Sequence, residues 1–152
     1  RAKILSTINE KDEKSMKSHG DVKRRFLGKY IIPGPPVALA RPRFGKDNIY
    51  DSQKEIKLIH GITITSQHDN MPLFNGPLHL EAHFYMPCAK DFFKKVGALP
   101  HQRVPDLSNL IKYIEDICIG ILYPDDKLIT GITAYKWYSD SPRTEFIISE
   151  IV

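Results

Sequence analysis

Hydrophobic and polar positions follow a helical period between Val104 and Asp126, the most strongly patterned stretch of the chain. On a helix of about 100° per residue, the large apolar side chains fall on one broad face: Leu107, Leu110, Ile111, Tyr113, Ile114, Ile117 and Cys118. The other face is polar and consists of Ser108, Asn109, Lys112, Glu115 and Asp116. The pattern predicts an amphipathic helix whose apolar face docks on a core.

Local residues mark both ends of this predicted helix. Pro105 disfavours a helical conformation in the residue before it, and Asp106 can accept hydrogen bonds from the first backbone N–H groups. Gly120 favours an end to the helix. Residues 124–126, Pro-Asp-Asp, predict a turn before a strand that begins near Leu128. We expect this turn to return its two carboxylates to the amino-terminal end of the helix.

The other elements follow from shorter patterns. Strands are predicted at residues 29–33, 78–86, 129–138 and 143–152, and a second helix at residues 54–67. Ser52 and Glu55, three residues apart, predict a capping box at the start of the second helix. Only the turn at residues 139–142 separates the last two strands, so we expect them to pair as a hairpin. This order predicts an α+β fold: one domain with a mixed β-sheet packed with helices.

The length and composition are typical of one soluble globular domain. The chain has 152 residues, 41% of them hydrophobic and 26% charged. No apolar run approaches the roughly 20 residues of a membrane span, and the first residues contain no apolar segment of a secretory signal. The cysteines, Cys88 and Cys118, form no disulfide framework. We interpret both as reduced thiols in a cytosolic compartment.

The formal net charge of +4 is unevenly distributed. Residues 1–27 carry the whole excess, and we interpret them as a basic N-terminal arm before a domain that spans residues 28–152; a solvated tail is the alternative. Within the domain, residues 28–57 carry a net +3 and residues 104–128 a net −3. An acidic segment beside basic ones fits a metal site surrounded by a phosphate-binding surface. Chance patterning of a solvated surface is equally compatible with these counts.

Basic side chains near aromatic ones are the candidate nucleic-acid contacts. Prolines stiffen the loop GPPVALARPRFG, which presents Arg41, Arg43 and Phe44, a combination that can grip phosphate and stack on a base. The alternative is a stiff connector whose arginines pair with surface carboxylates. The candidate nucleic-acid-binding residues are Arg41, Arg43, Lys46, Lys94, Lys95, His101 and Arg103.

The strand predicted at residues 78–86 raises the question of a metal site. Its polar face contains His79, Glu81 and His83, and side chains two apart on a strand point the same way. A zinc site usually adds cysteine or a distant ligand, and the sequence shows no such third group. We therefore interpret these side chains as facing solvent or a partner.

The carboxylates around the central helix are better suited to magnesium. Asp106, Asp125 and Asp126 offer the oxygen ligands that Mg²⁺ prefers, and such an ion can activate water for phosphodiester hydrolysis. Lys112 follows Asp106 by about one and a half turns and could neutralise charge on the phosphate or position the water. Its alternative role is an ion pair on the helix surface. The spacing alone indicates a metal-dependent nuclease only weakly, because it is common.

The string PDLSNLIKYIEDICIGILYPDD resembles the signature of the RusA family of Holliday-junction resolvases, which includes phage and prophage members. That signature runs Pro-Asp-x-Asp-Asn-Leu-x-Lys, continues through a helix with an internal Asp, and ends Gly-(aromatic or aliphatic)-x-x-Asp-Asp. The segment PGPPVALARPRFG, Tyr50-Asp51 with Gln53-Lys54, and His101 are similar to the family as well. The resemblance covers residues 29–152.

The resemblance implies a homodimeric, Mg²⁺-dependent endodeoxyribonuclease, with Mn²⁺ as an alternative metal. Such an enzyme resolves four-way DNA junctions by paired nicks in recombination and repair, in the cytoplasm of a bacterial or phage-infected cell. Matched to the motif, the catalytic residues are Asp106, Lys112 and Asp126, and the metal site comprises Asp106, Asp125, Asp126 and Ser108. Where the family has a second aspartate, this chain has Ser108, a neutral and weaker ligand for Mg²⁺ than a carboxylate.

Two alternatives stay open at this point. Ser108 could have removed cleavage and left a junction-binding protein, unless Glu115 on the same polar face compensates. A metal-dependent phosphohydrolase with a small substrate is the other alternative, in which the basic segments are incidental. Steeply salt-dependent DNA binding distinguishes the DNA-acting proteins from the phosphohydrolase. Mg²⁺-dependent cleavage distinguishes the nuclease from the binding protein.

Overall fold

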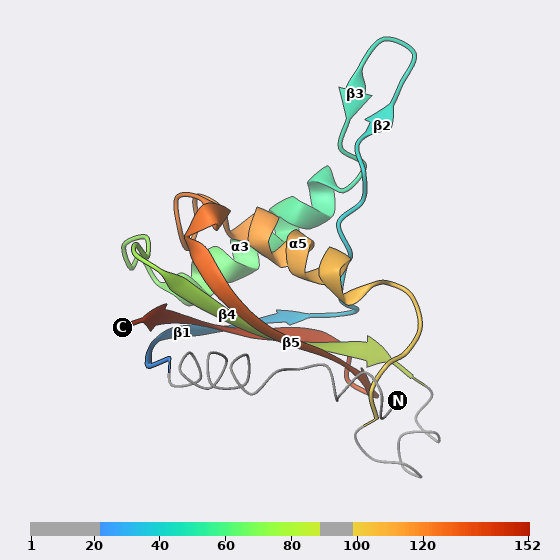
Figure 1. Ribbon diagram of the computed structural model, residues 1–152. Coiled ribbons are helices and arrows are strands. Elements are labelled where there is room, and N and C mark those ends of the chain that lie inside the picture. Colours follow the sequence, from blue (N-terminus) through green and yellow to red (C-terminus); the bar gives the residue numbers. More distant parts are fainter. Residues whose placement is uncertain (1–21, 89–98) are drawn as a thin grey trace, which may run out of the picture.

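A four-stranded mixed sheet carries both long helices on one of its faces (Figure 1). The computed structural model describes residues 22–88 and 99–152. The sheet consists of β1 (Arg24–Pro33), β4 (Leu78–Pro87), β5 (Ile129–Ser139) and β6 (Arg143–Ile151). The helices are α3 (Lys54–His68), α5 (Leu107–Cys118) and the 3₁₀ helix η1 (Asp126–Leu128), and a small hairpin pairs β2 (Arg43–Phe44) with β3 (Ile49–Tyr50). The predicted α+β class with a mixed sheet is confirmed.

The strand order is β1-β6-β4-β5, with β4 and β5 parallel and the other pairs antiparallel. The predicted hairpin between β5 and β6 is therefore wrong. Tyr85 of β4 pairs with Trp137 of β5 on one side and with Arg143 of β6 on the other. The alternating strand β4 is the most thoroughly buried on its helix side, and it is one of the two interior strands, between β6 and β5.

The core lies between the sheet and the two helices. Leu80 and Phe84 of β4 and Ile148 of β6 are inaccessible to solvent, and Leu110 of α5 packs with them. Each such side chain contributes about 1.5–3 kcal/mol of transfer free energy on burial. A buried polar pair joins the helices, because His60 Nδ1 of α3 lies 2.8 Å from the hydroxyl of Tyr113 on α5. This buried hydrogen bond joins the two helices to each other.

Three local features differ from the sequence-based expectations. β1 begins at Arg24 rather than at Lys29, so the first strand reaches into the segment that was assigned to the basic arm. The capping box is wrong, because the N-cap of α3 is Gln53 and no side chain caps it. His79 is buried and lies 2.9 Å from Arg24 Nη1, so it faces neither solvent nor a partner. Residues 1–21 lie outside the described part of the chain, and none of the described helices is long and apolar enough to cross a membrane.

Candidate active site

The polar face of α5 carries most of the predicted active-site residues. The apolar face packs on the core as predicted, with Leu110, Tyr113, Ile114, Ile117 and Cys118 buried. Ser108 and Lys112 are exposed on the other side, and Glu115 is half-buried. Side chains three or four residues apart lie on one face of a helix, so Lys112 stands between Ser108 and Glu115. This row is the surface on which the candidate site is built.

The turn after α5 is fixed against the carboxyl-terminal half of the helix. Tyr123 is buried, and its hydroxyl donates a 2.8 Å hydrogen bond to the backbone oxygen of Glu115. Leu122 is also buried, and its backbone oxygen accepts a 2.7 Å hydrogen bond from the N–H of Phe74. Because both contacts anchor the turn, the two aspartates that follow it are held near the end of α5.

Four carboxylates therefore gather where α5 meets this turn, and we call them the acidic cluster: Glu115, Asp116, Asp125 and Asp126. Burial raises the pKa of Glu115, and the charge of Asp126 raises it further. Partial removal from water raises the pKa of Asp126, as do Asp125 and Asp116. By contrast, the N–H of Lys127 donates a 2.9 Å hydrogen bond to Asp125 and lowers the pKa of that carboxyl. Glu115 and Asp126 are thus less stable in their charged forms than ordinary carboxylates, and a bound cation would offset the repulsion between the carboxylates.

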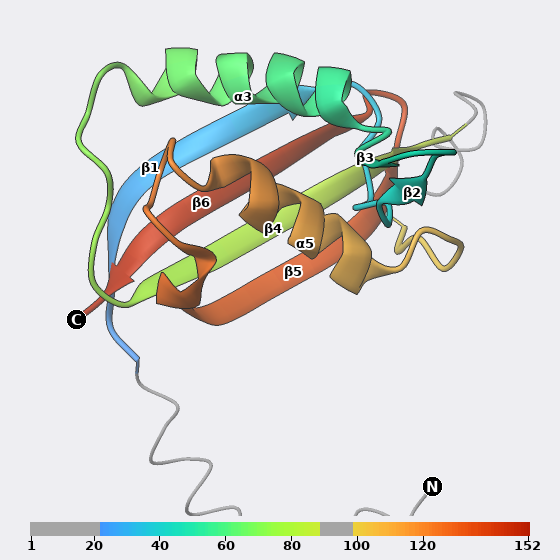
Figure 2. The same ribbon diagram turned by 90° about the horizontal axis from the view of Figure 1, so that it is seen from above.

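Asp106 lies at the opposite end of α5. It is the N-cap residue, but its side chain makes no capping hydrogen bond. A rise of about 1.5 Å per residue puts it about 13 Å from Glu115 along the helix axis. α5 and β5 run in opposite directions (Figure 2), so the turn leads into the start of β5, whereas Lys136, late in β5, donates a 2.7 Å hydrogen bond to the backbone oxygen of Pro105. The expectation that the turn returns to the amino-terminal end of the helix is therefore wrong.

Carboxylate and hydroxyl oxygens are the kind of ligand that Mg²⁺ prefers, but within one chain these candidate ligands lie at two separate ends of α5. Asp106 and Ser108 lie at one end of α5, and Asp125 and Asp126 lie at the other. Across residues 22–88 and 99–152, no group of three or more His, Cys, Asp or Glu side chains is arranged so that it could hold a metal ion. Each end of α5 thus supplies part of the ligand set that was predicted for a single site.

The predicted nucleic-acid-binding residues fall into three groups. Arg41, Arg43 and Lys46 are exposed around the β2–β3 hairpin. His101 packs its ring against Tyr138 at a centroid distance of 4.7 Å, and its Nδ1 atom is buried without a hydrogen-bond partner in the described structure. The remaining members of the set are Arg103, which is exposed, and Lys94 and Lys95, which lie outside the described residues.

Two lysines that the sequence did not single out position parts of the site. Lys136 Nζ donates 2.7 Å hydrogen bonds to the backbone oxygens of Arg103 and Pro105, and so holds the loop that enters α5. Lys57 of α3 lies 2.6 Å from Asp51 Oδ2 and 3.3 Å from Asp116 Oδ2. No local sequence pattern predicts these contacts, because each joins residues that are far apart in the sequence or on different elements.

The His-x-Glu-x-His face of β4 forms no metal site in the described structure. Besides its contact with Arg24, His79 lies 3.1 Å from the hydroxyl of Thr133. His83 lies 3.2 Å from Glu81 Oε1 and accepts a hydrogen bond from the indole N–H of Trp137. Each of these three side chains thus has a partner within the sheet.

Comparison with known proteins finds a matching family and a similar curated protein. The family model described as endodeoxyribonuclease RusA matches residues 33–149. That range includes both ends of α5, the acidic cluster and the β2–β3 hairpin. Among curated proteins, the uncharacterized protein YqaN of Bacillus subtilis (strain 168) is 28% identical over 136 residues, which cover 81% of this chain and 96% of that protein.

Proposed function

The chain belongs to the RusA family of endodeoxyribonucleases, and from this premise we propose that it resolves four-way DNA junctions by paired nicks in a reaction that depends on Mg²⁺. The observation that carries the proposal is the polar face of α5, which places Lys112 between Ser108 and Glu115 and ends at the acidic cluster. Because its proposed substrate is DNA, we expect the protein to act in the cytoplasm of a bacterial or phage-infected cell.

We assign the proposed roles from the family motif and from the geometry of α5. Asp106 and Asp126 would be metal ligands and catalytic residues, with Ser108 and Asp125 beside them. Bound Mg²⁺, or Mn²⁺ in its place, would supply an activated water and charge stabilisation at the leaving oxygen. Lys112 would neutralise charge on the phosphate. Its ammonium lies close to the acidic cluster, where it partly offsets the rise in the pKa of Glu115 that burial and Asp126 cause.

Glu115 is the residue that we add to this set. It is half-buried, it couples electrostatically to Asp126, and it lies on the same face of α5 as Ser108. These contacts support a role for Glu115 in compensating for the missing second aspartate of the family. The Glu115 carboxylate adds to the acidic cluster the negative charge that Ser108 lacks. An inactive but folded Glu115→Gln variant is the expected result, and full activity would remove Glu115 from the site.

The outer face of α3, which we define as Leu58, Ile59 and Ile62, is the surface that we propose for a homodimer. All three side chains are more than half exposed, an unusual concentration of aliphatic surface on one helix. Leu58 and Ile62 border a groove of about 470 Å³ between α3 and α5 that is also lined by Asp116, Ile117 and Ile121. A second copy seated there would lie next to the acidic cluster.

We further propose that the dimer assembles each active site from two chains. Within one chain, Asp106 and Asp126 are at opposite ends of α5, too far apart for one ion. Two-fold symmetry repeats every contact, so one contact between the Asp106 end of a protomer and the partner's Asp126 would create two equivalent sites. Two sites related by a two-fold axis suit a substrate in which two strands are nicked.

The first test of the function is cleavage of a synthetic four-way junction and of a matching linear duplex, with Mg²⁺ and with Mn²⁺. Paired nicks near the crossover in the wild type, absent in Asp126→Asn, are expected. Tight junction binding without nicks under either metal would favour the binding protein in which Ser108 has removed cleavage. Absence of salt-dependent DNA binding would favour the small-substrate phosphohydrolase.

Mixed dimers test the two-chain site separately. Asp106→Asn and Asp126→Asn are each expected to abolish cleavage. In a mixed dimer of these variants, a two-chain arrangement leaves one site with both aspartates intact, so single nicks should reappear. If each site belonged to one chain, both sites would carry a substitution and the mixed dimer would stay inactive.

A further inference from the structure

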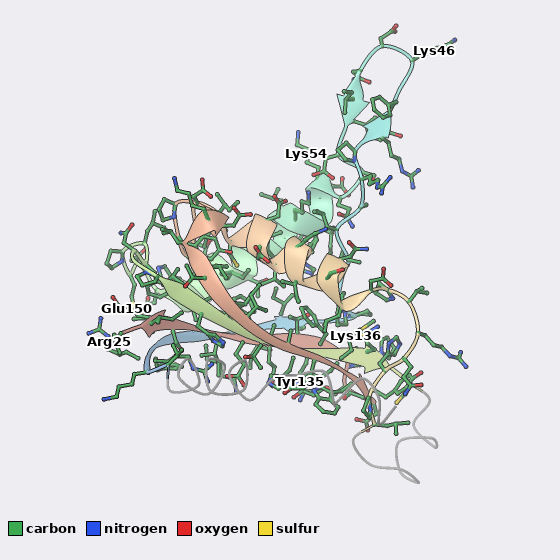
Figure 3. All side chains as sticks on the ribbon, viewed as in Figure 1. Arg25, Lys46, Lys54, Tyr135, Lys136 and Glu150 are labelled. Carbon is green, nitrogen blue, oxygen red and sulfur yellow. The ribbon has the colours of Figure 1, made fainter. Side chains whose placement is uncertain are left out.

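The β2–β3 hairpin projects from the domain as an arm, which we define as residues 41–50 (Figure 1). Every residue of the arm is exposed, and Lys46 lies at its tip (Figure 3). The backbone N–H of Gly45 donates a 2.7 Å hydrogen bond to the oxygen of Asn48, which closes the tip. The arm therefore has an ordered hairpin backbone and makes little contact with the core.

The base of the arm is fixed to the active-site helix. Gln53 accepts a 2.9 Å hydrogen bond from the N–H of Ala40 and donates one of 2.8 Å to the oxygen of Ala38. The N–H of Leu39 donates a 3.0 Å hydrogen bond to the backbone oxygen of Asn109 in the first turn of α5. Because these bonds span both the entry and the exit of the arm, the arm is held at the Asp106 end of α5.

Strand register divides the arm into two faces. Phe44 pairs with Ile49, and Arg43 pairs with Tyr50. Directly opposite residues of an antiparallel pair point to the same side of the ribbon, so Phe44 and Ile49 share an apolar face, while Arg43 and Tyr50 share the other. Phe44 is 83% exposed and Ile49 is 65% exposed. An aromatic and an aliphatic side chain thus stand together in solvent on a narrow projection.

We infer that this arm enters the branch point of the DNA and sets the selectivity for junctions, with Phe44 stacked on a base at the crossover and Ile49 packed beside it. The inference rests on the proposed function, because it presupposes a branched DNA substrate. Architectural DNA-binding proteins insert phenylalanine or isoleucine between base steps in this way. Unstacking a base costs less free energy at a branch point than inside a duplex. Stacking on Phe44 therefore stabilises the complex with a junction more than the complex with a duplex.

The charge of the arm favours DNA over a protein as the occupant of its apolar face. The cations are Arg41, Arg43 and Lys46, and the one acidic residue of the arm is Asp47. Guanidinium groups beside an inserted aromatic ring would contact the phosphates that flank the unstacked base. These phosphate contacts bind any DNA, whereas the stacking contact requires an open branch. We therefore predict that the basic side chains set the affinity for DNA in general and that the apolar face sets the preference for a junction.

Phe44→Ala is the direct test, with binding measured in the absence of divalent metal so that no DNA is cut. Junction affinity is expected to fall about 10-fold, within the range for loss of one base–aromatic stack, while duplex affinity stays unchanged. A 2-aminopurine placed at the crossover should brighten when wild type binds, because its base leaves the helical stack, and should brighten less with Phe44→Ala. Phe26→Ala removes an equally aromatic, exposed side chain from β1 and should change neither quantity.

Arg43→Gln separates the two faces of the arm. Its expected effect is a similar loss of affinity for junction and duplex and a shallower salt dependence, by about one phosphate contact. Unchanged junction preference and unchanged 2-aminopurine fluorescence in Phe44→Ala would overturn the inference, and paired cleavage by that variant would still leave the proposed function standing. A change of oligomeric state in Phe44→Ala, with the fluorescence unchanged, would show that a second copy covers the face and would equally overturn it.

Discussion

Lys136 of β5 donates a 2.7 Å hydrogen bond to the backbone oxygen of Pro105, the residue before Asp106. A second bond of 2.7 Å reaches the oxygen of Arg103. One ammonium group thus holds two carbonyls of the loop that enters α5. The Asp106 side chain accepts no capping hydrogen bond, so we infer that Lys136, which holds the backbone just before it, helps to position this carboxylate.

The first prediction concerns this contact. Lys136→Met keeps an unbranched side chain that lacks only the terminal ammonium, and it removes both hydrogen bonds, each worth about 1.5–3 kcal/mol when a charged group takes part. We expect junction cleavage in a single turnover to slow about 10-fold or more, with junction affinity nearly unchanged. Lys29→Met, on the exposed side of β1, is the matched control. Equal losses of affinity and cleavage would indicate that Lys136 binds DNA and does not position Asp106.

The second prediction concerns the pKa of Glu115, which burial and Asp126 raise. A raised carboxyl pKa gives stability that is present below the unfolded pKa and is lost as the pH rises through the folded value. We therefore expect Glu115→Gln to melt at a higher temperature than wild type at about pH 8 and to show no gain at about pH 4. Glu55→Gln, on an exposed carboxyl of α3, should show neither effect. A gain at both pH values would mean that charge is not the cause.

The third prediction addresses Ser108. Ser108→Asp restores the carboxylate of the family motif and should lower the Mg²⁺ concentration that gives half-maximal cleavage by about 10-fold. Asn109→Asp adds the same charge one residue later, in a different direction around α5, and is the control. If both variants respond alike, the gain comes from net charge near the helix start, and position 108 has no special place in the site.

The fourth prediction tests the outer face of α3. Leu58→Glu and Ile62→Glu each place a charge where two copies are proposed to meet, and burying an unpaired charge costs several kcal/mol. Both variants should be folded monomers by light scattering and should lose paired cleavage. Phe26→Glu changes an exposed apolar residue elsewhere and should leave the oligomeric state unaltered. A wild type that is monomeric at assay concentrations would contradict the proposal directly.

The fifth prediction concerns acid stability. Burial lowers the pKa of His60, whose Nδ1 lies 2.8 Å from the Tyr113 hydroxyl. The unfolded chain then binds more protons, so the stability from this neutral imidazole is complete above the unfolded pKa of about 6.5 and declines as the pH falls below it. Urea unfolding at about pH 7.5 and pH 5.5 should show this decline, and the decline should be smaller in His60→Phe. An equal decline in both proteins would assign it to other groups.

The sequence by itself determined the elements whose patterns are local. The apolar face of α5 and the alternation of β4 follow from periods of 3.6 and 2 residues, and the structure has both where they were predicted. The motif that runs from Pro105 to Asp126 also indicated the family, because its residues are contiguous in the sequence. What these patterns have in common is that they depend only on neighbours along the chain.

Only the tertiary structure decided which elements meet. β4 lies between β5 and β6 although the turn that joins those two strands is short, because a strand with a thoroughly buried face takes an interior position in the sheet. That arrangement starts β5 at the end of α5, and so it places Asp125 and Asp126 with Glu115 and Asp116 and far from Asp106. The contacts of Lys136 and Lys57 arise in the same way. Long-range packing fixes such distances, and no periodicity in the sequence records them.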